Sequence, residues 1–109
     1  MTDEGVELEV AIDVSEGATR LVLVGDLDIA SASLVESRVA AARPLGAPLI
    51  VDVSQLQFVD SSGLRALTAA RHAAVQDTGE AVTLTGCREM LSRLLEMTGL
   101  RDSFAYAPN

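Results

Sequence analysis

Lysine and tryptophan are absent from this chain of 109 residues, and only three of its residues are aromatic. Its eight basic residues are all arginines, and sixteen acids outnumber them, which gives a net charge of −8. Binding to DNA or RNA requires clustered positive charge, so we expect no nucleic-acid partner. Cysteine and histidine occur once each, as Cys87 and His72. One cysteine excludes an internal disulfide bond, and the pair is a poor ligand set for a metal ion, so we expect neither a metal nor another cofactor.

The sequence also lacks any long hydrophobic run. No stretch approaches the ~18 apolar residues that would suggest a transmembrane helix, so we expect no membrane partner. Residues 1–5 carry neither the positive charge nor the apolar segment of a signal peptide, which favours a cytoplasmic location. Because 49% of the residues are apolar, a chain of this length can bury one core. The sequence therefore predicts a single domain over residues 1–109, with its core within about 6–106.

The beginning of the chain predicts a β-hairpin. Residues 6–14 alternate apolar and polar side chains, which is typical of a strand with one face in water. Residues 15–18 are a turn cluster, and residues 19–24 predict a second strand that ends at Gly25. The two strands should pair in the antiparallel sense.

After the hairpin, helical and strand patterns alternate. Residues 49–53 form a nearly continuous apolar run, which predicts a central strand covered on both faces. Further short strands are expected at 81–85 and 104–106, and helices at 31–43, from the Asp60–Gly63 turn to about 76–79, and around 90–98. This order predicts an α/β domain with one mixed sheet of about four to five strands, in which the hairpin comes first, parallel strands follow, and helices pack against the sheet.

Individual residues mark the ends and buried faces of these helices. Ser31 or Ser33 is available to cap the first helix. Gly99 is suited to end the third helix, with Leu100 as a contact just beyond the cap. The second helix should bury an apolar stripe that comprises Leu64, Leu67, Ala70, Ala74 and Val75.

The turn Asp60-Ser61-Ser62-Gly63 follows an apolar run and begins the second helix. Loops at the carboxyl ends of parallel strands form the usual functional edge of such a sheet. Any of the three polar residues can cap the helix by accepting a hydrogen bond from a backbone N–H, worth ~1 kcal/mol, and a hydroxyl here can also be chemically modified. Catalysis by a serine nucleophile is disfavoured, because the Gly-x-Ser-x-Gly pattern is absent and His72 has no acid clearly placed to orient it.

Three motifs carry a family resemblance that runs from about Val6 to Tyr106. The motifs are Gly25-Asp26-Leu27-Asp28, Phe58-Val59-Asp60-Ser61-Ser62-Gly63-Leu64 and Leu94-Leu95-Glu96-Met97-Thr98-Gly99-Leu100. In order and spacing, they resemble the STAS domain of bacterial anti-sigma-factor antagonists. The resemblance implies a non-enzymatic protein that binds an anti-sigma factor with serine kinase activity, frees the sigma factor, is inactivated by phosphorylation, and is reset by a phosphatase.

The resemblance also implies a role for each site residue. By position, Ser61 is the phosphorylated serine. Asp60 would orient its hydroxyl or cap the helix, Ser62 would help to define the loop, and Gly63 would let the backbone of the partner come close. A second contact region would be formed by the loop with Asp26 and Asp28.

Two other functions remain open from the sequence. Some STAS domains act as scaffolds or adaptors without a phosphorylation cycle. In addition, Cys87 and Arg93 have the Cys-x5-Arg spacing of cysteine phosphatases, in which a thiolate attacks phosphorus. The residues between them argue against this enzyme, because Met90 and Leu91 fit the buried face of a helix better than a phosphate-binding loop.

Overall fold

Five strands form a single sheet in the computed structural model, which describes residues 8–15, 17–43 and 46–108. The strand order is β1-β2-β3-β4-β5. β1 pairs with β2 in the antiparallel sense, and each later pair is parallel, which confirms the predicted α/β class. The bounds are Glu9–Ser15 for β1, Ala18–Leu27 for β2, Leu49–Val59 for β3, Thr83–Thr85 for β4 and Ala105–Ala107 for β5.

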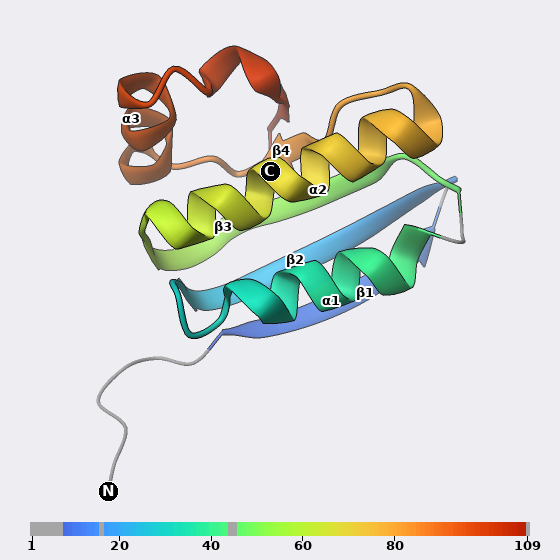
Figure 1. The fold of residues 1–109 in the computed structure, drawn as a ribbon, viewed down its shortest axis with the longest axis horizontal. Helices are drawn as coiled ribbons and strands as arrows, with labels where there is room; N and C mark the ends of the chain where they lie inside the picture. The colour runs from blue at the N-terminus through green and yellow to red at the C-terminus, as the bar shows by residue number, and fades with distance from the viewer. Residues whose placement is uncertain (1–7, 16, 44–45, 109) are drawn as a thin grey trace, which may run out of the picture.

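The helices follow the predicted order. They are α1 (Ala32–Ala42), α2 (Ser61–Thr78), α3 (Glu89–Met97) and a short 3-10 helix, η2 (Arg101–Ser103). Helices α1 and α2 lie side by side across one face of the sheet, and α3 stands near the end where α2 begins (Figure 1). Within the described residues, no helix combines the length and the hydropathy needed to cross a membrane.

Aliphatic side chains build the core between the sheet and the helices. Every second residue of β2, from Thr19 to Leu27, is buried, which places this side of the strand beneath α1 and α2. Phe104 is the aromatic side chain that joins this core. The fully buried aliphatic side chains comprise Leu21, Leu23, Leu27, Val35, Val51, Val53, Leu67, Val82, Leu84, Leu91 and Leu95.

The hairpin differs from its prediction in two ways. β2 continues through Gly25 to Leu27, because glycine accepts the positive φ of 116° found there, beside a shift in the register with β3. The predicted apolar face of β1 is only partly covered, since Ile12 and Val14 are 41% and 54% exposed on this edge strand. The predicted strand residues 6 and 7 lie outside the described part of the chain.

The prediction for the central strand was also partly wrong. β3 is the middle strand, but it is covered by helices on one face only: Val51 and Val53 are buried, whereas the alternating Ile50 and Asp52 are half-buried. The second face is partly polar, because Arg20 Nη1 lies 3.7 Å from Asp52 Oδ2 there. The continuous apolar run of this strand therefore occurs with helices on only one face of the sheet.

The helix ends agree closely with the sequence. α2 ends at Gly79 in the left-handed conformation. At the end of α3, Leu100 N donates to Leu95 O (2.8 Å) and Gly99 N donates to Glu96 O (3.2 Å), which is the Schellman motif. The predicted stripe of α2 is buried except for Val75, which is 39% exposed beside Ala74.

Two buried threonines leave their hydroxyl groups without a hydrogen-bond partner among the described residues. They are Thr19 and Thr85, whose residues are 1% and 3% exposed. Replacing Thr85 with the similarly shaped valine should raise the free energy of unfolding by about 1 kcal/mol, because a buried hydroxyl without a partner is costly.

Denaturant unfolding measures this effect. Thr83→Val is the matched control, since it makes the same change in the same strand at a half-buried residue, and it should stabilise less. If the two substitutions raise the free energy of unfolding equally, the increase comes from the higher β-propensity of valine and not from removal of the buried hydroxyl.

Candidate functional site

Asp60 connects β3 to α2 and caps the helix. Its backbone is extended, and its Oδ1 accepts a hydrogen bond from Gly63 N at 3.0 Å. Its carbonyl accepts the first helical hydrogen bond, from Leu64 N at 2.9 Å. Of the three residues that could cap α2, the structure therefore selects Asp60.

The cap leaves Ser61 as the first residue of the helix. Ser61 is exposed, and its hydroxyl makes no hydrogen bond to the described part of the chain, whereas Ser62 is half-buried. A hydroxyl without an internal partner can reach a reaction partner without first breaking a contact. The structure thus separates the capping residue from the residue that faces the solvent.

Gly63 lets the start of α2 approach the end of β2. A Cβ atom on Gly63 would overlap with Leu27 O and lie 2.8 Å from Leu27 Cγ. Asp60 N also donates to Leu27 O, at 3.2 Å. Our prediction that Gly63 makes room for a partner differs from the structure, in which Gly63 is buried and makes room for Leu27.

The loop between β2 and α1 is held by its own side chains. Asp28 Oδ1 accepts hydrogen bonds from Ala30 N (3.0 Å), Ser31 N (3.2 Å) and Ser31 Oγ (3.1 Å). Asp26 O is a second acceptor for the single hydrogen of this hydroxyl, at 2.8 Å from Ser31 Oγ. Ser31 does occupy the N-cap position of α1, but its hydroxyl serves the loop and makes no capping bond to the helix. Asp28 therefore gives the loop a fixed shape.

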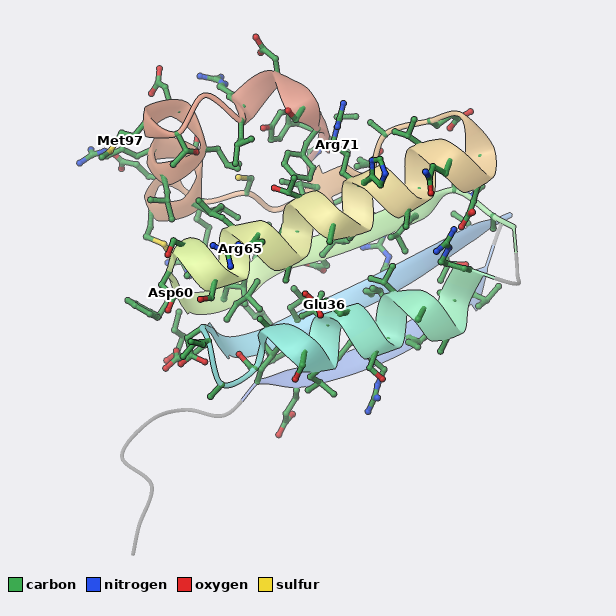
Figure 2. The ribbon with its side chains drawn as sticks, in the orientation of Figure 1. Glu36, Asp60, Arg65, Arg71 and Met97 are labelled. Carbon is green, nitrogen blue, oxygen red and sulfur yellow. The ribbon has the colours of Figure 1, made fainter. Side chains whose placement is uncertain are left out.

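The two predicted contact regions meet at the carboxyl ends of β2 and β3. Asp26 lies opposite Phe58 in the parallel register, and Leu27 lies opposite Val59. Asp60 and Ser61 follow at once, and Figure 2 places Asp60 at this end of the molecule, with Arg65 one turn further along α2. The structure thus brings together all the site residues that the sequence indicated: Asp26, Asp28, Asp60, Ser61, Ser62 and Gly63.

Exposed apolar side chains border this end of the sheet, and they were not among the site residues predicted from the sequence. Ile29 in the β2–α1 loop is 79% exposed, and Phe58 at the end of β3 is 49% exposed. Met90 of α3 was predicted on the buried face of its helix, but it is 42% exposed. Together with Leu56, it lines a groove of about 430 Å³ between β3 and α3. The sequence did hold a signal for Phe58, which alternates with the inward-facing Val59.

Cys87 and Arg93 do not form a phosphate-binding loop. Arg93 lies within α3, where its Nη2 is 2.8 Å from Glu89 Oε2. Cys87 is partly buried, and this burial raises the pKa of its thiol, although the charge of Arg101 acts in the opposite direction. A cysteine nucleophile requires a lowered pKa, so the structure does not support the phosphatase reading of this spacing.

Gly63→Ala tests the close approach of α2 to β2. The added methyl group meets Leu27, so we expect the free energy of unfolding to fall by about 1–3 kcal/mol, as for other overpacked positions. Ser62→Ala at the neighbouring half-buried residue is the control and should change it by less than ~0.5 kcal/mol. Equal stability of Gly63→Ala and the unchanged protein, measured by denaturant unfolding, would refute this account of Gly63.

Comparison with known proteins identifies relatives over nearly the whole chain. The STAS domain family matches residues 9–109. The anti-sigma-B factor antagonist of Bacillus subtilis (strain 168) is 25% identical over 97 residues, which cover 89% of this chain and 88% of that protein.

Solved structures show the same fold. A crystal structure of an anti-sigma factor antagonist from Mycobacterium paratuberculosis has a TM-score of 0.83 at 22% identity, covering 94% of this chain and 87% of the other. The phosphorylated form of the Bacillus cell fate determinant SpoIIAA has a TM-score of 0.63 at 22% identity, covering 94% and 90%. The fold, the arrangement of the motifs and the family match over residues 9–109 lead to one conclusion: this chain belongs to the STAS domain family.

Proposed function

We propose that this protein is a cytoplasmic anti-sigma-factor antagonist that is switched off by phosphorylation of Ser61. The observation that carries the proposal is the exposed hydroxyl of Ser61, which lies at the start of α2 after the cap at Asp60 and makes no hydrogen bond to the described residues. The B. subtilis relative is named as an anti-sigma-B factor antagonist, and a structural neighbour was solved in a phosphorylated form, which supports both parts of the proposal.

The proposed cycle has two states. Unphosphorylated protein binds an anti-sigma factor and thereby frees the sigma factor. The anti-sigma factor acts as a kinase: Ser61 Oγ attacks the γ-phosphorus of ATP, the bond to the β–γ bridging oxygen breaks, ADP leaves, and the hydroxyl proton passes to a base. A phosphatase then hydrolyses the phosphoserine and restores the active state.

Electrostatics explain how one phosphate can end binding without unfolding the protein. The phosphate adds roughly −1.5 to −2 charges, and the start of α2 stabilises a negative charge by about 0.3–1 kcal/mol. A carboxylate or nucleotide phosphate of the partner ~4 Å away costs up to ~4 kcal/mol at an effective dielectric of about 20. That cost corresponds to roughly a thousandfold loss of affinity, so repulsion at the interface outweighs the effect on the fold.

The surroundings of Ser61 suit a protein partner. Asp26 and Asp28 add negative charge on the neighbouring loop, and Ile29, Phe58 and Met90 offer exposed apolar contacts. Interfaces combine such apolar anchors with a polar rim. We infer that the anti-sigma factor presents apolar side chains to this end of the sheet, basic side chains opposite Asp26 and Asp28, and negative charge opposite Ser61.

Incubation with the cognate anti-sigma factor and ATP tests the modification directly. We expect mass spectrometry to find one phosphate, on Ser61, in the unchanged protein and in Ser62→Ala, and none in Ser61→Ala. Phosphate on another residue would contradict the assignment to Ser61. No phosphate on any variant, together with a Ser61→Ala protein that remains fully functional and regulated in cells, would favour the scaffold function instead.

Binding measured by calorimetry tests the consequence of the charge. Ser61→Ala should bind the anti-sigma factor persistently, because it carries no charge and cannot be phosphorylated, and Ser61→Asp should bind at least about tenfold more weakly. Equal affinities of Ser61→Ala and Ser61→Asp would be incompatible with repulsion as the cause of release.

The apolar contacts can be tested with a matched pair of substitutions. Ile29→Ser removes an exposed aliphatic side chain beside the site and should weaken binding to the anti-sigma factor by roughly tenfold. Val14→Ser makes a similar change in β1. Val14 is also exposed, and it lies opposite Thr19, at the end of β2 that is far from the site. This substitution should leave the affinity unchanged, and a loss of similar size in both variants would show that the effect is not specific to the site.

A further inference from the structure

Arg65 is the charged side chain nearest to Ser61 along α2. The two residues are four positions apart, so their side chains lie on the same face of the helix, and helical side chains lean toward the N-terminus. An arginine at this position can therefore reach back toward Ser61. Figure 2 shows Arg65 near the start of α2 and Arg71 further along the same helix.

The guanidinium of Arg65 is available for a new contact. Arg65 is exposed, and within the described ranges it takes part in no ion pair and no side-chain hydrogen bond. Several other arginines are engaged: Arg71 Nε, for example, donates to Ser103 O at 2.7 Å. The first two turns of α2 contain no other charged residue.

We propose that Arg65 is a positioning residue for the phosphate, which it binds once Ser61 is phosphorylated. The inference rests on the proposed function, because it assumes that Ser61 is modified. A guanidinium matches phosphate oxygens in geometry and charge. Arg65 therefore holds the phosphate along α2 and favours its doubly charged form.

Other charged groups surround the site, and the acidic ones repel the phosphate. Asp60 caps the same helix, Asp26 and Asp28 stand on the neighbouring loop, and the exposed Arg88 and Glu89 lie beside Leu56 at the start of α3. The same groups are present in every variant compared below, so they do not affect the comparison.

The test uses full-length protein in which phosphoserine is incorporated at position 61 during translation, and it follows the phosphate by 31P NMR as a function of pH. With Arg65 present, the second pKa of the phosphate should be lower by roughly half a unit than in Arg65→Gln. Arg65→Lys should retain most of this shift. Arg71→Gln removes a positive charge from the same helix at a position ~15 Å from Ser61 along the helix axis, and it should leave the phosphate pKa unchanged.

An equal phosphate pKa with arginine or glutamine at position 65, or an equal shift in Arg71→Gln, would overturn the inference. Because the phosphoserine is incorporated without a kinase, this result is independent of whether the anti-sigma factor modifies Ser61. A failure of the proposed function would appear instead in the kinase and binding experiments described above.

Discussion

The contact between Gly63 and Leu27 is the constraint on which the rest of the site depends. It places the first turn of α2 directly against the end of β2, closer than any side chain at position 63 would allow. Asp60 fixes this arrangement from both sides, since its backbone N–H bonds to Leu27 and its carboxylate bonds to Gly63. The loop held by Asp28 follows Leu27 at once, so this one close approach brings two separate motifs to one surface.

The same arrangement gives neighbouring residues different roles. Asp60 and Gly63 serve the fold, which leaves Ser61 without a structural task and in contact with solvent. A residue of this kind can change its charge while the helix keeps its cap and its packing. Arg65 lies on the same face of α2, one turn away from the phosphate that the proposed switch would add.

Much of the fold could be predicted because each signal was local. The existence of β2, the arrangement around Gly99 and the end of α2 at Gly79 follow from residue type and backbone preference, and the structure confirms them. The single covered face of β3 could not be predicted, because an apolar run reports hydrophobicity and not the number of layers that pack on it. The continuation of β2 past Gly25 depends on the register with β3, which is a long-range property.

Only part of the site could be predicted from the sequence. Its residues were identified by resemblance, but the choice of Asp60 as the cap and the burial of Gly63 required the positions of Leu27 and of the helix. Exposed side chains such as Ile29 and Met90 resemble core residues by type, so only the folded chain shows that they face solvent.

Amide hydrogen exchange of Gly63 and Leu64, compared with and without a phosphate on Ser61, tests the central claim most directly. This claim is that modification changes the surface and not the fold. The account predicts that both amides, which bond to Asp60, keep their protection. Loss of protection at both would show that the phosphate opens the start of α2, and that the switch acts by local unfolding instead of repulsion.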